Sequence, residues 1–155
     1  MTQHSVAYET FVIERTYDAP VDQVFRAWAD PELKTRWFAG SADALGDTYK
    51  LDFRVGGHEI NSGGPPGGPH YTYDSDYREI IPEQRIIYTY EMHADENLIS
   101  VTVATIEFKG AGATTHLLLT EQGVFLDGHD NVAQREAGTR SFLESLATML
   151  ENHGS

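Results

Sequence analysis

The chain has 155 residues, of which 40% are hydrophobic, and this length and composition favour one globular domain, which we expect to span residues 1–155. Twenty-four acidic residues against 11 basic ones give a formal net charge of −13 at pH 7, and such a surface repels nucleic-acid phosphates. The absence of cysteine excludes disulfide bonds, thiolate catalysis and cysteine-based metal sites.

The hydrophobic residues are dispersed along the chain. No apolar run approaches the roughly 18 residues that a membrane-spanning helix requires. Residues 1–9 lack the basic segment and the apolar segment of a secretory signal peptide. We therefore expect a cytoplasmic protein with no membrane span and no nucleic-acid partner.

The first predicted elements are one strand and two short helices. Residues 8–17 are rich in β-branched and aromatic side chains and alternate as a strand does. Pro20 then suits the first turn of a helix. The apolar face of this helix has the spacing i, i+3, i+4, i+7 and consists of Val21, Val24, Phe25 and Trp28. We expect Trp28 to pack in the core.

The second short helix begins at the sequence Asp30-Pro31-Glu32, in which Asp can cap and Pro can occupy the first helical position. It should end near Arg36, so that Trp37 and Phe38 directly follow its C-terminus. Residues 39–47 then form a loop. No periodicity requires burial of these two aromatic residues. They are either core residues or residues at the rim of a cavity, where the indole N–H would face water at the cavity entrance.

From Thr48 to Glu121 hydrophobicity has a period of two, which predicts an antiparallel sheet. Paired glycines, Gly56 and Gly57, favour a tight hairpin turn between its first two strands. Residues 62–69, rich in glycine and proline, form an irregular connection. The strands are predicted at residues 49–55, 58–61, 71–81, 85–93, 98–109 and 114–121.

After Gly128 the period changes to 3.6, which predicts a long C-terminal helix with one apolar stripe that is interrupted at Gly138 and Thr139. The stripe consists of Val132, Arg135, Thr139, Phe142, Leu143, Leu146, Met149 and Leu150. The expected fold class is therefore α+β: a curved antiparallel sheet of about six to seven strands wraps the long helix, and two short helices follow strand 1.

Four segments follow one another between residues 8 and 150: "YDAPVDQVFRAWADPELKTRWF", "DFRVGGHE", "YREIIPEQRIIYTYEM" and "AGTRSFLESLATML". In this order and spacing they resemble the activator-of-heat-shock-protein-90-ATPase-like family of the START/SRPBCC, polyketide cyclase-like superfamily. The resemblance implies a helix-grip fold, a hydrophobic cavity between sheet and long helix, and often a homodimer in bacteria. The family usually has a tryptophan after the glycine of the long helix, where this chain has Thr139.

The candidate ligand-binding residues combine the aromatic inner face of the sheet with the long helix and the Trp-Phe pair. Each tyrosine by itself could be ordinary packing, but the group resembles an amphipathic pocket wall. The candidates are Trp37, Phe38, Tyr49, Phe53, His58, Tyr77, Tyr88, Tyr90, Met92, Thr139, Phe142 and Leu146.

No motif indicates catalysis or a bound metal. The chain contains neither HExxH nor G-x-S-x-G, and its glycine-rich segments lack the features of a phosphate-binding loop. Candidates for acid–base chemistry exist by residue type, but alternation places most of them on the solvated face: Arg54, His58, Glu59, Arg78 and Glu79. We therefore predict no catalytic residue, no metal and no cofactor.

Three functions are compatible with these observations. The first is binding of a small hydrophobic or aromatic ligand in the cavity between the sheet and the long helix. The second, which follows from the resemblance, is a co-chaperone-like protein that stimulates a heat-shock chaperone ATPase in a stress response. The third is a polyketide cyclase- or dehydratase-like enzyme, which would need a buried ionisable group that faces the cavity. We favour the non-enzymatic binder.

Overall fold

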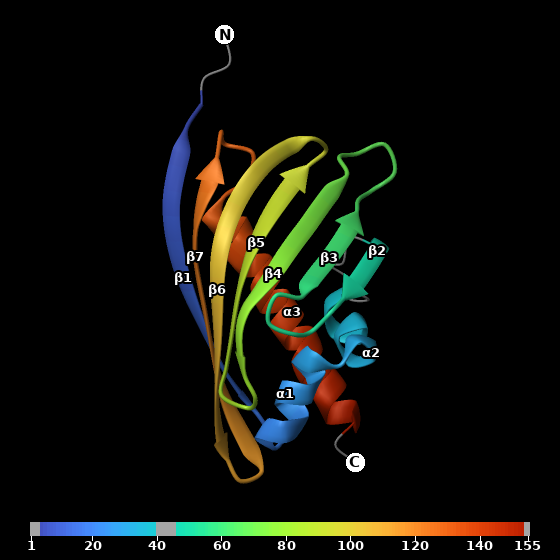
Figure 1. Ribbon diagram of the computed structural model, residues 1–155, viewed down its shortest axis with the longest axis vertical. Coiled ribbons are helices and arrows are strands. Elements are labelled where there is room, and N and C mark those ends of the chain that lie inside the picture. Colours follow the sequence, from blue (N-terminus) through green and yellow to red (C-terminus); the bar gives the residue numbers. More distant parts are fainter. Residues whose placement is uncertain (1–3, 40–45, 154–155) are drawn as a thin grey trace.

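The computed structural model describes residues 4–39 and 46–153, and it shows a curved seven-stranded antiparallel sheet with a long helix against one face (Figure 1). Part of the loop expected at residues 39–47 lies outside the described residues. The strands are β1 (Val6–Tyr17), β2 (Gly46–Leu51), β3 (His58–Gly63), β4 (Tyr71–Ile81), β5 (Arg85–Ala94), β6 (Asn97–Ala111) and β7 (Thr114–Leu126). The helices are α1 (Val21–Ala29), α2 (Pro31–Lys34) and α3 (Val132–His153), with a π-helical turn, η1 (Thr35–Ala39), after α2.

The strand order is β1-β7-β6-β5-β4-β3-β2, and every neighbouring pair is antiparallel. Strands β2 to β7 are therefore joined as consecutive hairpins, whereas β1 pairs with the last strand at the opposite edge. The chain crosses between the two edges through α1, α2 and η1, which lie at one end of the sheet (Figure 1). The predicted α+β class, the curved sheet and the order of its helices are confirmed.

The two short helices begin as the sequence indicates, but the second one ends differently. In α1, Trp28 is buried as predicted. The Asp30 side chain caps α2 by accepting a hydrogen bond from the backbone N–H of Glu32 at 2.9 Å. We expected the helical segment to end near Arg36, but it does not. It continues as η1, so that Trp37 and Phe38 lie in a helical turn rather than in a loop.

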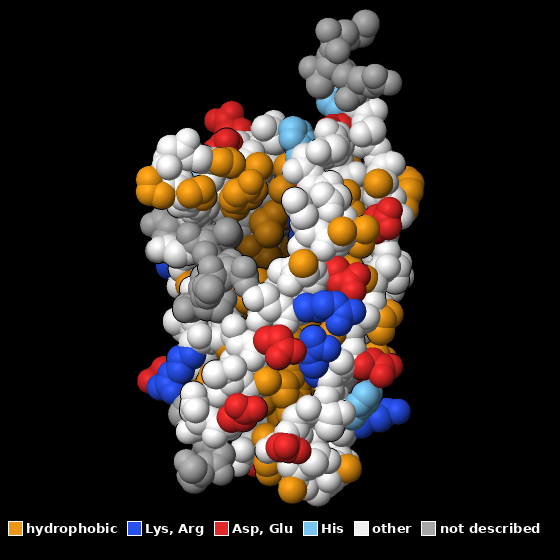
Figure 2. Space-filling model, turned by 180° about the vertical axis from the view of Figure 1, so that it is seen from behind, with side chains coloured by type: hydrophobic (Ala, Val, Ile, Leu, Met, Phe, Trp, Pro, Cys, Tyr) orange, Lys and Arg blue, Asp and Glu red, His pale blue; other side chains and the backbone are white. Residues whose placement is uncertain are grey.

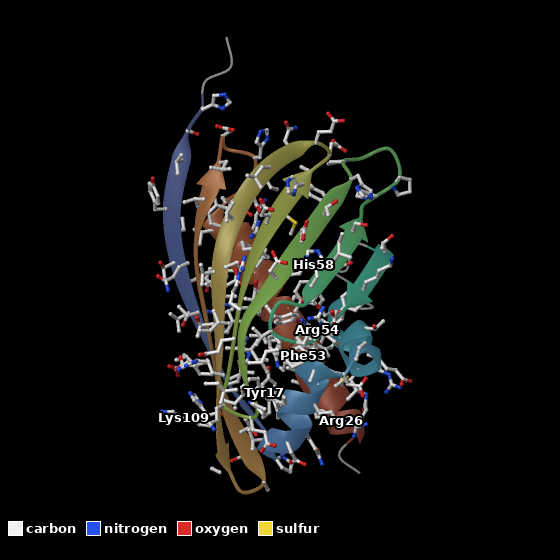
Figure 3. All side chains as sticks on the ribbon, in the orientation of Figure 1. Tyr17, Arg26, Phe53, Arg54, His58 and Lys109 are labelled. Atoms are coloured by element: carbon white, nitrogen blue, oxygen red, sulfur yellow. The ribbon has the colours of Figure 1, made fainter. Side chains whose placement is uncertain are left out.

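The first hairpin is shorter than its alternating pattern predicts, because β2 ends at Leu51 rather than near residue 55. The backbone N–H of Gly56 donates to the carbonyl of Tyr77, and the Tyr77 N–H donates to the carbonyl of Gly57. These bonds attach the turn to β4, so it does not continue β2. Phe53 and Arg54 lie in this turn (Figure 3).

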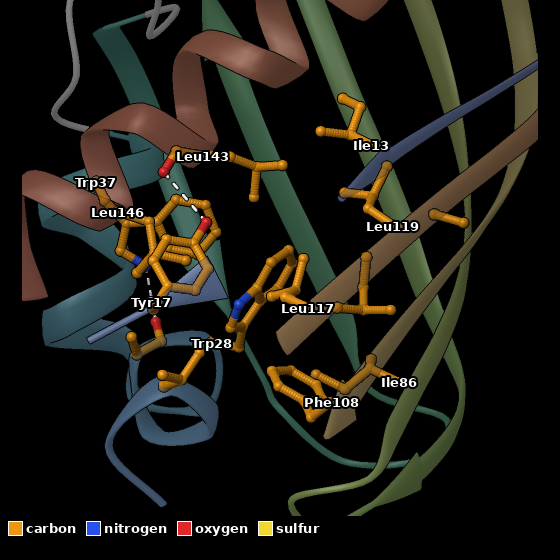
Figure 4. Close-up of a cluster of buried hydrophobic side chains, with 14 of the residues drawn as sticks. Ile13, Tyr17, Trp28, Trp37, Ile86, Phe108, Leu117, Leu119, Leu143 and Leu146 are labelled. Carbon is orange, nitrogen blue, oxygen red and sulfur yellow. Dashed lines mark hydrogen bonds between the residues drawn. The ribbon is translucent and has the colours of Figure 1, made fainter. Parts of the chain in front are cut away.

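Helix α3 covers the concave face of the sheet and is joined to β1 by side chains. The Tyr17 hydroxyl donates to the carbonyl of Leu143 at 3.2 Å, and Arg15 pairs with Glu144 at 3.1 Å. The core between sheet and helices is continuous; its central members include Ile13, Trp28, Trp37, Ile86, Phe108, Leu117, Leu119, Leu143 and Leu146 (Figure 4). Within the described residues, no helix is long and apolar enough to cross a membrane.

Candidate functional site

A cavity of about 270 Å³ lies between the concave face of the sheet and α3. Figure 2 shows the face that carries α3, where hydrophobic side chains lie deep in a hollow. The predicted residues that line the cavity are Trp37, Phe38, Tyr88, Tyr90, Met92, Thr139 and Phe142. The structure thus brings together the aromatic strands, the Trp-Phe pair and the polar interruption of the long helix, although it does not test whether they bind a ligand.

Trp37 lies deeper than a residue at a cavity mouth, so of the two alternatives for this residue the structure supports the core rather than a rim position with the N–H facing water. The indole is 2% exposed, and its N–H donates to the carbonyl of Ala27 at 2.8 Å (Figure 4). The ring also packs against Trp28, with 4.8 Å between ring centres. Both tryptophans therefore belong to the core and contribute the floor of the cavity.

Phe38 is the half-buried member of the pair and connects the walls of the cavity. Its ring centre lies 4.8 Å from that of Phe142 on α3 and 5.4 Å from that of Tyr73 on β4. The ring centre of Tyr73 in turn lies 4.7 Å from that of Tyr90 on the neighbouring strand. The sheet, η1 and α3 thus each present aromatic surface to the same space.

Four of the remaining predicted residues are buried or partly buried but do not line the cavity. Leu146 is a fully buried core residue of α3. Phe53 packs against Phe25 and Tyr77, because β2 ends before it and the turn points it toward α1. The hydroxyls of Tyr49 and Tyr77 both donate to Glu59.

His58 lies on the outer face of the sheet, which contradicts its assignment to the ligand site (Figure 3). Successive residues of a strand point to opposite faces, and its neighbour Glu59 faces inward. The His58 imidazole lies 2.7 Å from the carboxylate of Asp74 and 2.9 Å from that of Asp76. This cluster is solvent-facing, and among the described residues no group of three or more side chains could hold a metal.

A buried ion pair borders the cavity where β3 meets α2, and we did not predict it. The Lys34 ammonium lies 2.9 and 2.8 Å from the two carboxylate oxygens of Glu59, and both side chains are almost fully buried. Burial lowers the pKa of Lys34, and the charge of Glu59 opposes this shift. The ammonium also lies 4.8 Å from the centre of the Phe38 ring, within the range of a cation–π contact.

A second polar cluster borders the cavity on the β7 side. Glu121 accepts a hydrogen bond from the Tyr90 hydroxyl. Arg135 of α3 donates to that hydroxyl at 3.0 Å, to Ser100 at 2.9 Å and to Asp130 at 2.6 Å. Burial raises the pKa of Glu121 to about 7, and the hydrogen bond from Tyr90 and the charge of Arg135 limit the shift. The cavity therefore holds a carboxyl group that exchanges its proton near neutral pH.

The charged and amide side chains that line the cavity were all missed by our sequence predictions: Lys34, Asn61, Glu121, Asp130, Gln134 and Arg135. One signal was present for Glu121. Strand alternation places it on the same face as Leu117 and Leu119, which are buried. We expected the strand to end there, but β7 continues to Leu126, so this carboxyl lies in the middle of a strand.

The family model for "Activator of Hsp90 ATPase homolog 1-like protein" matches residues 18–151. An uncharacterized protein from Rhizobium leguminosarum is 42% identical, with a TM-score of 0.91 over 97% of this chain and 99% of its own. The Mll3558 protein from Rhizobium loti is also 42% identical, with a TM-score of 0.86 over 94% and 99%. CalU16 from Micromonospora echinospora, 20% identical with a TM-score of 0.65 over 96% and 85%, shares the fold. No curated protein matches the chain.

Removal of one partner of the Lys34–Glu59 pair should destabilise the protein strongly. We expect Glu59→Leu to lower the free energy of unfolding by about 3–5 kcal/mol, because it leaves a buried ammonium without its counter-ion. The double variant Lys34→Met/Glu59→Leu should recover most of this loss, since it buries no charge. Urea denaturation of the three proteins measures both effects.

The pair of Arg15 with the exposed Glu144 provides a control. The Glu144 side chain is 66% exposed, so Glu144→Leu should change the free energy of unfolding by at most about 1 kcal/mol. If Glu59→Leu cost no more than this control, the ion pair would not be a buried, mutually dependent unit.

Glu121 should make the stability of the protein depend on pH near neutrality. Its folded-state pKa of about 7 exceeds the ordinary value of 4.5, so the folded protein binds this proton more tightly. The resulting stabilisation is fully present below pH 4.5 and is lost as pH rises through 7. Relative to Glu121→Gln, we expect the wild type to lose about 3 kcal/mol between pH 4.5 and 8. Denaturation curves over this range measure the difference, and a pH-independent difference would contradict the shift.

Proposed function

Because the chain belongs to the activator of Hsp90 ATPase homolog 1-like family, we propose that it binds a small hydrophobic or aromatic molecule in the cavity between its sheet and α3. The observation that carries this proposal is the cavity itself, a space of about 270 Å³ with aromatic walls and a few convergent polar groups. Most ligand sites of proteins have this character: they are concave, mainly apolar and provided with a small number of orienting polar atoms.

The α3 side of the cavity supports the proposal because it carries small residues at the position where the family usually has an indole. A Cβ atom built on Gly138 would meet no other atom within 4 Å. The Thr139 hydroxyl donates to the carbonyl of Arg135, one turn earlier in the same helix, at 2.9 Å. Neither residue fills the space in front of it, so a guest molecule can occupy it.

A ligand should be detectable as added mass and added stability. Native mass spectrometry of protein freshly purified from its source should show a bound small molecule. Addition of a hydrophobic ligand at a hundred times its dissociation constant should raise the free energy of unfolding by about 2.7 kcal/mol. Thr139→Trp should fill the cavity and weaken binding at least about tenfold, at a cost in stability of about 1–3 kcal/mol.

Thr148→Trp provides the matched control for that variant, because Thr148 is an exposed residue of the same helix. It should leave the affinity of the ligand unchanged. An apo mass together with no stabilisation by any member of a hydrophobic compound panel would refute the binding function.

A polyketide cyclase- or dehydratase-like enzyme is a second candidate, and Glu121 is the observation that favours it. The carboxyl group borders the cavity, accepts a hydrogen bond from Tyr90 and has a pKa of about 7. A general acid or base works best when its pKa lies near the operating pH. The fold likeness to CalU16 is compatible with this chemistry but does not supply a substrate.

A chaperone-directed function rests on the family description alone. An ATPase assay with the cognate heat-shock chaperone tests it: stimulation at micromolar protein is the result that this function requires, and its absence would remove it. Homodimer formation, a single domain over residues 1–155, a cytoplasmic location and a role in stress stay predictions.

A further inference from the structure

Asn61 of β3 is a buried amide that borders the cavity. It is 3% exposed and lies on the concave face, opposite Tyr73 of β4 in the strand register. Among residues 4–39 and 46–153, no side chain or backbone group is hydrogen-bonded to this amide. Among the described residues, the fully enclosed polar side-chain atoms without a partner are Trp28 Nε1 and Ser75 Oγ. The Asn61 amide is not one of them, so its polar atoms keep contact with the cavity that they border. The amide therefore has hydrogen-bonding capacity available to a molecule in the cavity.

The positively charged groups at the cavity are already paired within the protein. Lys34 is neutralised by Glu59, and the Nη2 atom of Arg135 lies 2.6 Å from Asp130. Glu121 adds a further carboxyl group. The cavity thus offers no uncompensated positive charge among the described residues, and an anion that entered would lose its hydration without an equivalent partner.

The wall beside Asn61 is aromatic. Tyr73, its cross-strand neighbour, is in contact with Phe38, and Phe38 is in contact with Phe142 of α3. A planar ring that packs against this wall can place one substituent at the amide. An amide can donate to an oxygen and also accept from a hydroxyl, so either kind of substituent satisfies it.

On the basis of the proposed function, we propose that the ligand is an uncharged aromatic molecule whose hydroxyl or carbonyl group hydrogen-bonds the side-chain amide of Asn61. The ring lies against Phe38 and Tyr73, and the amide fixes its orientation. The aromatic walls supply affinity for any compound of suitable shape, whereas Asn61 selects the compound that carries the polar group.

Four naphthalenes that differ in one substituent at position 2 test this inference: the hydroxyl, acetyl, methyl and carboxylate compounds. Titration calorimetry should show that the hydroxyl and acetyl compounds bind the wild type about tenfold more tightly than the methyl compound, the value of one hydrogen bond. The carboxylate should bind most weakly. In Asn61→Leu this preference should disappear while the methyl compound keeps its affinity. Asn97→Leu, the same substitution at the exposed first residue of β6, should behave as the wild type.

The outcomes separate this inference from the function on which it depends. If none of the four compounds binds the wild type, the inference about an aromatic ligand at Asn61 fails, whereas the binding function itself fails only if the native mass and the hydrophobic compound panel are also negative. If the methyl compound binds as tightly as the others, or the preference survives in Asn61→Leu, the cavity binds ligands but Asn61 does not select them. Tightest binding of the carboxylate would overturn the inferred neutrality. If Asn61→Leu does not fold, Asn61→Ala provides the same comparison.

Discussion

The structure depends on one constraint, which is that a curved sheet must bury its apolar concave face against a single long helix. Close contacts hold the helix at particular points, such as the Tyr17 hydroxyl on the carbonyl of Leu143. Where α3 lines the cavity it carries the small residues Gly138 and Thr139, and these leave the space between the helix and the sheet open. The same constraint therefore produces both the continuous core and the cavity between the sheet and α3.

Burial of the charged groups shapes this cavity as much as its aromatic residues do. Burial of unpaired ions would be very costly, so Lys34 forms an ion pair with Glu59 and Arg135 forms one with Asp130. This pairing removes net attraction for an anion and leaves hydrogen bonding as the main polar interaction open to a guest. Glu121 is the exception, because its proton leaves near neutral pH and changes the charge of the cavity.

Much of the fold could be predicted because local patterns survive in the tertiary structure. From the period of two we predicted the observed bounds of β4, and the bounds of β5 and β6 to within two residues. From the period of 3.6 we predicted the helix α3. The aromatic members of the site followed from the same patterns. Phe53 was misplaced because hydrogen bonds from the turn to β4 end β2 early, an interaction between segments that local alternation does not contain.

The amino-acid sequence by itself determined the fold class, the order of elements and the aromatic inner face, since hydrophobic periodicity reports which side of each element is buried. Only the tertiary structure decided which buried groups meet. Lys34 and Glu59 are 25 positions apart, and Tyr90 and Glu121 are 31 apart, so nothing local indicates either pair. The depth of Trp37 and the unpaired amide of Asn61 were likewise set by what packs around them, because burial and hydrogen bonding are properties of the assembled fold.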